Sequence, residues 1–140
     1  MLHASRRESP KVLEIVERLR NELQIPVFHD DQHGTAIITL AAVINALRIL
    51  HKEIVNIRVV IAGAGSAGYG IFKILQEAGC RNIVVTDSIG AIYESRVKGI
   101  DSPYKKEIAN KTNPMRLSGS LSELLRGSDI FIGVSGKVAS

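Results

Sequence analysis

The chain has 140 residues, a mass of 15.2 kDa and a formal net charge of +4 at pH 7. Its 45% hydrophobic and 23% charged residues suit one globular domain and exclude a disordered chain or a collagen-like repeat. Its 18 basic residues are spread among 14 acidic ones, and aromatics are few, so we expect no nucleic-acid partner. A single cysteine, Cys80, the lack of an apolar leader and the polar interruptions in run 36–50 favour a cytoplasmic protein without a membrane span.

The first 50 residues are expected to form two helices joined by a short strand and a loop. Apolar residues recur at helical spacing after Ser9-Pro10, which predicts an amphipathic helix. The apolar residues 25–28 predict a brief buried strand, and 29–35 predict a loop. Thr35 can cap the following helix, 36–50, which is apolar nearly all round and should therefore be buried on several sides.

Residues 58–87 predict one strand–helix–strand unit of the expected length. A β-branched strand, 58–62, leads into Gly63-Ala-Gly65-Ser-Ala-Gly68, and a helix follows that Gly79 ends. A second strand covers 82–87. The unit indicates parallel strands with a crossover helix between them.

The rest of the sequence predicts short elements. We expect a loop at residues 88–96, a short helix at 104–109, and a capping box at 120–123 that opens a last helix. The strand 129–134 is the third of parallel type, whereas a complete doubly wound domain has about six strands. We therefore expect an α/β fold with a Rossmann-like doubly wound parallel sheet, about half of a dinucleotide-binding domain, preceded by helices.

The glycine pattern at the first strand end favours dinucleotide binding. Gly63 permits a tight turn, Gly65 allows the backbone to approach a pyrophosphate, and Gly68 allows close packing of helix on strand. The N–H groups that open the helix would face the phosphates. A Rossmann unit that binds nothing remains the alternative.

Asp87 bears on the choice of cofactor. A carboxylate at the end of the second strand can accept hydrogen bonds from ribose hydroxyls and repels a 2′-phosphate, which favours NAD over NADP. Arg81 and Arg96 keep NADP open. A second glycine-bearing strand end, 133–136, either flanks the cofactor or is a plain turn.

Asp30 and Asp31, flanked by His29 and His33, have the oxygen and imidazole donors of a divalent metal site. Adjacent carboxylates do not normally both face one ion, so composition alone favours a turn or the cap of the next helix as the role of Asp30, with the metal site as the alternative. The two histidines more often make local hydrogen bonds than bind zinc.

Five segments in order resemble the central region of bacterial and archaeal malic enzymes. They are 26–36 (PVFHDDQHGTA), 62–68 (AGAGSAG), 87–93 (DSIGAIY), 111–114 (KTNP) and 131–135 (FIGVS). The resemblance spans residues 12–138 and implies oxidative decarboxylation of L-malate to pyruvate and CO₂ with NAD or NADP and Mg²⁺ or Mn²⁺.

The resemblance also implies roles for individual residues. Asp31 matches a metal ligand, and Asp30 matches a neighbour that helps to set the catalytic lysine, so Asp30 is the one expected catalytic residue. The expected cofactor-binding residues are Thr35, Gly63, Ala64, Gly65, Ser66, Ala67, Gly68, Asp87, Ser88, Val134, Ser135 and Gly136.

Some of the family's pattern is missing from these residues. The family's Glu-Asp metal pair should precede Val12, but residues 2–8 lack it, and Glu8 is a poor substitute. The family's tyrosine acid, lysine base and substrate asparagine find no match either. We expect a partial malic enzyme that is inactive alone, with residues 1–35 from the substrate and metal region and 36–140 from the NAD(P)-binding domain. It should form a homo-oligomer or associate with complementing segments; the alternative is a non-catalytic nucleotide-binding or assembly module.

Overall fold

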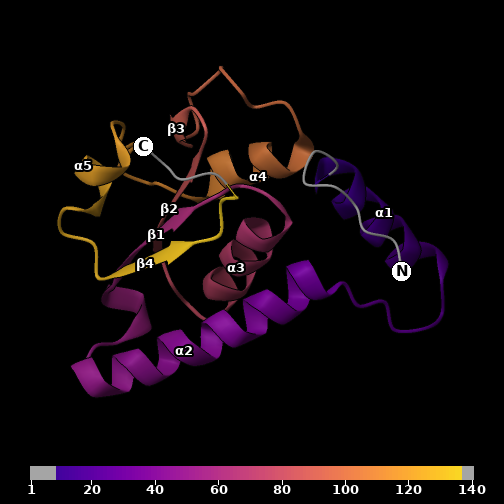
Figure 1. Cartoon of the computed structure of the whole chain (residues 1–140), viewed down its shortest axis with the longest axis horizontal. Coiled ribbons are helices and arrows are strands. Elements are labelled where there is room, and N and C mark those ends of the chain that lie inside the picture. The colour runs from indigo at the N-terminus through magenta and orange to yellow at the C-terminus, as the bar shows by residue number, and fades with distance from the viewer. Residues whose placement is uncertain (1–8, 137–140) are drawn as a thin grey trace.

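A four-stranded sheet lies at the centre of the computed structural model, which describes residues 9–136 (Figure 1). The strand order is β3-β2-β1-β4. Strand β1 (Arg58–Ala62) pairs in parallel with β2 (Asn82–Asp87) and with β4 (Ile130–Gly133), and the short β3 (Gly90–Ala91) pairs antiparallel with β2. The helical elements are α1 (Ser9–Glu22), η2 (a π-helical turn, Asp30–Gly34), α2 (Thr35–Leu50), η3 (Ile54–Asn56), α3 (Ser66–Glu77), α4 (Pro103–Lys111) and α5 (Leu121–Leu125).

Helices cover both faces of this sheet, which confirms the expected α/β, doubly wound class. Side chains alternate along a strand, so Val59 and Ile61 enter the core cluster that contains residues of α3 and α4. Val60 of β1 and Val84 of β2 instead pack with Leu124 of α5 on the other face. Strands β1 and β2 are therefore buried from both sides, as expected of parallel strands in an α/β sheet, whereas Phe131 of the edge strand β4 is exposed.

Local sequence signals set several element ends. Ser102 caps α4, because its side chain accepts a hydrogen bond from the Lys105 backbone N–H. Ser120 and Glu123 form the expected capping box of α5. Gly79 follows α3 with φ of 101°, a left-handed conformation that glycine adopts at little cost.

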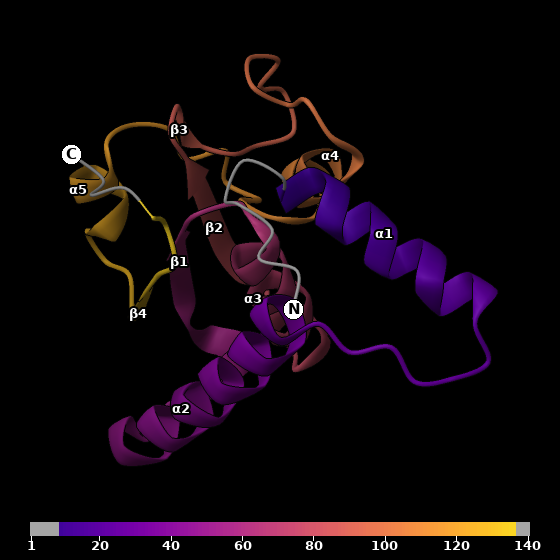
Figure 2. The same ribbon diagram turned by 45° about the vertical axis from the view of Figure 1, so that its right-hand side comes forward.

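Helix α1 lies at the side of the molecule, joined to the body by a long connection (Figure 2). Leu13 and Val16 are its buried apolar residues. A hydrogen bond from the Tyr104 hydroxyl to Glu17 Oε2, at 3.3 Å, also ties it to α4. This helix is amphipathic, as predicted.

The strand predicted at 25–28 is absent, and that prediction is wrong. The segment forms no strand, and Ile25 and Phe28 are exposed, with 64% exposure at Phe28. Pro26 lacks the N–H that a ladder needs. Phe28 instead lies against the His33 ring, with centroids 5.6 Å apart.

The predicted loop at 29–35 is a π-helical turn for most of its length. The His33 N–H donates to the His29 carbonyl at 2.7 Å, and the His29 N–H donates to His33 Nδ1 at 2.9 Å. These local bonds satisfy backbone groups that a loop would leave to water. Thr35 does not cap the next helix, because it is already helical and Gly34 occupies the N-cap position.

Helix α2 forms where predicted but is not buried on several sides. Its buried residues are Ala36, Val43 and Leu47, which form one stripe along the helix. Large apolar side chains elsewhere on α2 face solvent, and Ile38 is 73% exposed. The composition of α2 is apolar nearly all round, but residues 9–136 cover only one side of it.

The predicted loop at 88–96 contains β3. Ser88 and Ile89 turn the chain so that Gly90 pairs with Asp87 and Ala91 with Thr86. Gly90 has a φ of 132°, which favours glycine at this hairpin. The two-residue strand adds an antiparallel edge to the otherwise parallel sheet.

Candidate functional site

The glycine turn between β1 and α3 is packed too tightly for side chains at two of its three glycines. A Cβ on Gly63 would lie 2.9 Å from the Ser135 backbone nitrogen, and Gly63 has a φ of 123°. A Cβ on Gly68 would lie 1.8 Å from the Gly63 carbonyl oxygen. The turn therefore brings the start of α3 directly against the end of β1.

The start of α3 is built to face an anion. Gly65 is exposed and occupies the N-cap position, no side chain caps the helix, and its first turn has no acidic residue. Helix N-termini carry partial positive charge and N–H groups without helical partners. Ala64 and Ala67 are half-buried, and Ser66 is buried. These residues fit the pyrophosphate of a dinucleotide.

The second glycine-bearing strand end lies beside this turn. The Val134 N–H donates to the Ala62 carbonyl at 2.9 Å, because β4 is the parallel neighbour of β1. Ser135 and Gly136 follow and are exposed. The structure thus places 134–136 next to 63–68 at the carboxyl edge of the sheet, where open α/β folds bind ligands.

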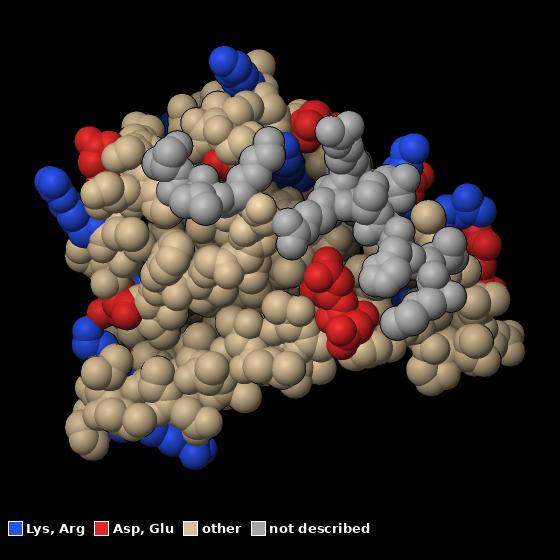
Figure 3. Space-filling model, viewed as in Figure 1, with Lys and Arg blue, Asp and Glu red and all other residues tan. Residues whose placement is uncertain are grey.

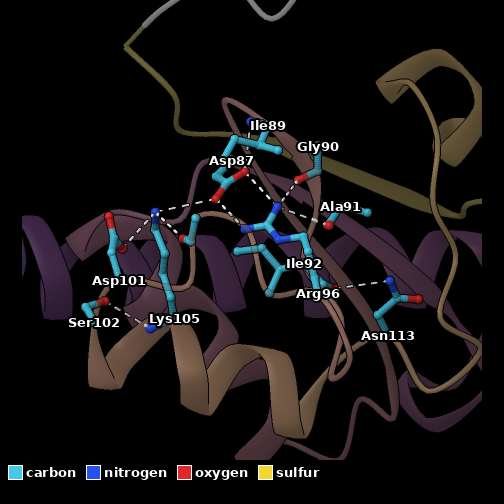
Figure 4. Close-up of polar contacts among 11 residues, drawn as sticks. Asp87, Ile89, Gly90, Ala91, Ile92, Arg96, Asp101, Ser102, Lys105 and Asn113 are labelled. Carbon is cyan, nitrogen blue, oxygen red and sulfur yellow. Dashed lines mark hydrogen bonds and ion pairs between the residues drawn. The ribbon is translucent and has the colours of Figure 1, made fainter.

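Asp87 lies at the end of β2 on the same edge, but its carboxylate is already engaged (Figure 4). Both oxygens accept hydrogen bonds from Arg96, and Oδ1 also accepts from the Ile89 N–H. Burial alone would raise the pKa of Asp87, but these bonds and the nearby charges of Arg96 and Lys105 outweigh burial and lower that pKa. The neighbouring Ser88 is exposed.

Asp30 and Asp31 lie in η2, which packs against the first half of α3. A Cβ on Gly70 would lie 2.2 Å from the Gln32 carbonyl oxygen, so η2 and α3 touch backbone to backbone. Both aspartates are exposed, and Figure 3 shows acidic side chains gathered where the chain enters α2. The structure therefore brings the aspartate pair near the helix that carries the glycine turn, while Thr35 is the first residue of α2.

Within residues 9–136 these acids do not make a complete metal centre. No group of three or more His, Cys, Asp and Glu side chains gathers there in a way that could hold a metal ion. The described residues thus offer Asp31 as one possible ligand and do not fit a full Mg²⁺ or Mn²⁺ shell, which needs several oxygens. The interpretation of residues 2–8, including Glu8, lies outside the described residues.

The sequence did not predict a polar cluster that lies between α3 and α4. Glu107 of α4 accepts hydrogen bonds from the Tyr69 hydroxyl at 2.6 Å, Lys73 at 2.9 Å and Lys111 at 3.0 Å. Burial would raise the pKa of Glu107, but these three bonds lower it to about 2. Only the i,i+4 spacing of Glu107 and Lys111 was visible as a signal in the sequence. The cluster joins α3 to α4.

The sheet, its two helical faces and the glycine turn at its carboxyl edge define the class of Rossmann-type domains. Comparison with known proteins is more specific, since residues 32–140 match the family model "Malic enzyme, NAD binding domain". The chain belongs to the malic enzyme family, whose members are oxidoreductases that bind NAD(P).

Individual relatives agree with this assignment. The chain is 51% identical over 127 residues to the NAD-dependent malic enzyme of Geobacillus stearothermophilus, and 43% identical over 130 residues to the NADP-dependent malic enzyme of Haemophilus influenzae. These alignments cover 91% of the chain in each case, but 26% and 17% of the relatives. A solved NAD-dependent malic enzyme of Thermotoga maritima superposes with a TM-score of 0.87 at 47% identity, over 91% of this chain and 34% of that one. The chain thus spans about a third or less of these relatives.

Helix α2 is also apolar enough to be a candidate membrane span. Together with η2 it forms a helical stretch, Asp30–Leu50, of 21 residues with a mean hydropathy of 1.5, enough by length and composition alone to cross a membrane. Most of this stretch falls within the matched NAD-binding domain, which begins at residue 32. Most of the stretch and the glycine turn therefore lie within one matched domain.

Proposed function

We propose that this chain binds NAD or NADP at the turn 63–68 and so carries the dinucleotide-binding part of the malic enzyme reaction. One observation carries the proposal: the close approach of Gly68 to the Gly63 carbonyl presents the uncapped start of α3 at the carboxyl edge of the sheet. The pyrophosphate would lie on this helix end, with the turn 134–136 beside it. When bound, the cofactor supplies the hydride acceptor.

A titration with NADH, followed by cofactor fluorescence, tests this proposal. We expect saturable binding by the folded chain, and loss of binding in Gly65→Val. Gly65 is exposed and has a φ of −85°, which valine can adopt, so this substitution blocks the approach of a pyrophosphate without straining the backbone. Ala42→Val, on an exposed part of α2, should bind as the unmodified chain does. Absence of saturable binding at millimolar NADH would refute the proposal.

We propose that this region takes part in the oxidation and decarboxylation of L-malate to pyruvate and CO₂ when the remaining segments of a malic enzyme are present. In such a complete enzyme Asp31 would be one ligand of a divalent ion that polarises the substrate oxygens, and Asp30 would help to position a catalytic lysine. Within residues 9–136, however, Tyr69 is held by Glu107, and burial raises the pKa of Tyr69 far above its usual value. It is thus poorly suited to act as the acid.

We therefore expect no malate-dependent reduction of NAD or NADP by this chain alone. General acid and base groups each contribute about 10²–10⁴-fold, and the family's tyrosine acid and lysine base find no match in this sequence, so turnover should be lost. The assay combines malate, Mn²⁺ and either cofactor with chain purified free of host malic enzyme. Turnover of about 10 s⁻¹, an ordinary enzyme rate, would show that other residues supply the general acid and the general base.

A second candidate function is a non-catalytic assembly module. The exposed apolar side of α2 favours it, because contiguous apolar surface on a folded domain commonly marks an interface. The two functions are compatible, since the apolar side of α2 and the glycine turn use different residues. Oligomerisation, through a second copy or through other segments of the family's architecture, forms part of this proposal.

A further inference from the structure

A small pocket lies between the end of α2, the turn η3 and the end of α3, at the end of α2 that points away from α1 (Figure 1). Because η3 precedes β1 and α3 precedes β2, the pocket lies toward the amino edge of the sheet, opposite the glycine turn. Its volume of about 330 Å³ is in the lower range of small-molecule sites. The lining residues are Ile44, Leu47, Arg48, Lys52, Ile54 and Ala78.

The wall of this pocket is apolar. Leu47 is 6% exposed and Ile54 is half-buried, whereas Ile44 and Ala78 are exposed beside the opening. An alkyl group of a ligand would remove this surface from water, which strengthens binding by up to about fourfold for each buried methylene. The wall therefore favours a ligand with an alkyl tail.

Two cationic side chains also line the pocket, and they differ in their partners. Lys52 is paired with Asp129 at the start of β4. Arg48 is exposed in the last turn of α2, and it makes no hydrogen bond or ion pair with any residue in the range 9–136. A guanidinium can hold a carboxylate by two parallel hydrogen bonds. Arg48 thus places a positive charge without an acidic partner beside the apolar wall.

The ends of α2 and α3 limit which anions this charge can attract. Both helices end beside the pocket, and the C-terminus of a helix carries partial negative charge. This partial charge offsets part of the Arg48 charge, so a small anion without a tail should bind poorly. A ligand therefore needs both the carboxylate and the alkyl tail.

We propose that this pocket binds a medium-chain carboxylate, with the alkyl tail on Leu47 and Ile54 and the carboxylate on Arg48. The size of the pocket, its apolar wall and the single cation without an acidic partner together define this class of ligand. The proposal does not depend on the nucleotide site, because the glycine turn uses other residues.

Titrations of the whole chain with butyrate, hexanoate and octanoate, followed by ¹H–¹⁵N NMR, test the proposal. We expect the affinity to rise by up to about fourfold for each added methylene until the tail fills the pocket. Octanoate should shift the amide signals of Leu47 and Ile54, and leave that of Ile38, near the start of α2, unchanged. Shifts spread equally along α2, or no saturable binding of octanoate, would overturn the proposal.

Two variants separate the roles of the carboxylate and the tail. Arg48→Gln should weaken octanoate binding about tenfold, the effect of one charge-assisted contact, and should change binding of the uncharged octanol less than about twofold. Ala78→Leu should abolish binding of both, because it fills the opening from an exposed position whose helical φ and ψ suit leucine.

Arg20→Gln is the matched control for Arg48→Gln. Arg20 is an exposed arginine on α1, away from the pocket, and its replacement should leave the octanoate affinity as it is. Equal octanoate affinity in Arg48→Gln and the unmodified chain would overturn the assignment of the carboxylate to Arg48. Equal affinity in Ala78→Leu and the unmodified chain would show that octanoate binds elsewhere, which also overturns the proposal.

Discussion

Among the ion pairs of the described residues, Asp87–Arg96 is the most buried. Both side chains are almost fully buried, and each satisfies the charge of the other. Removing one partner of such a pair leaves an uncompensated charge in a poorly hydrated place, which is far more costly than the loss of an exposed ion pair. This cost makes Asp87 a structural residue as well as a neighbour of the proposed ribose position.

Asp87→Asn should therefore lower the free energy of unfolding by about 3 kcal/mol, because the Arg96 charge stays buried without its partner. Urea denaturation followed by circular dichroism measures this loss. Asp101→Asn is the control, since Asp101 is an exposed partner of Lys105, and it should cost less than about 1 kcal/mol. Similar stability of the two variants would show that the buried pair is not structurally important.

Among elements, the contact of η2 with α3 determines where Asp30 and Asp31 lie. The two backbones meet at Gly70, where no side chain fits. Gly70→Ala should force η2 away from α3 and cost about 1–3 kcal/mol by overpacking. Urea unfolding measures the cost, and hydrogen exchange at the His33 amide should report the loosening of η2.

Gly133→Ala is the matched control for this substitution. A Cβ at Gly133 would meet only the Phe131 ring, at 3.5 Å, which is ordinary van der Waals contact. Its unfolding free energy and its exchange in η2 should stay close to those of the unmodified chain. If Gly70→Ala behaves like this control, η2 is not held by the contact with α3.

The α3–α4 contact should make stability depend on acid pH through Glu107. The pKa of Glu107 lies near 2 in the folded chain and 4.5 is its ordinary value, so the folded state favours the ionised form. Its contribution is fully present above about pH 4.5 and is lost as the pH falls toward about 2. We expect Glu107→Gln to flatten the decrease of the unfolding free energy across this range.

Urea titrations at several pH values between about 2 and 5 measure this effect. Glu94→Gln is the control, because Glu94 is an exposed partner of Arg116 and should leave the acid dependence unchanged. An equally steep acid dependence in Glu107→Gln and the unmodified chain would contradict the link between α3 and α4.

For the whole molecule, the exposed side of α2 predicts self-association of the chain. A surface of this kind loses contact with water when two copies meet, at about 25 cal/mol per Å² of apolar area. We expect sedimentation velocity to show oligomers that dissociate on dilution. Ile38→Lys, at an exposed position of α2, should shift the equilibrium toward the monomer.

Val97→Lys is the control for this prediction. Val97 is also an exposed apolar residue, but it lies in the segment between β3 and α4, away from α2. Its replacement should leave the oligomeric state as it is. A chain that sediments as a monomer at all concentrations would contradict the proposed role of α2 as an interface.

The sequence by itself determined the strand–helix–strand unit, the glycine turn, the last capping box and the family. These features depend on neighbours in the chain: β-branched runs, a helix period, and glycines where a turn needs positive φ or close backbone approach. The sequence also placed Asp87 correctly at the end of β2. It did not determine how far residues 25–28 and 36–50 are buried, because apolar side chains become buried only where another element covers them.

Only the tertiary structure decided the environment of Asp87. Arg96 comes back to it after the β2–β3 hairpin, and Lys105 approaches from α4, so the local charge depends on segments that the fold brings together. The same holds for η2, whose position follows from the close approach of Gln32 to Gly70. Long-range contacts of this kind have no fixed spacing along the chain, whereas the glycine turn does, and for that reason the turn could be predicted and the charge around Asp87 could not.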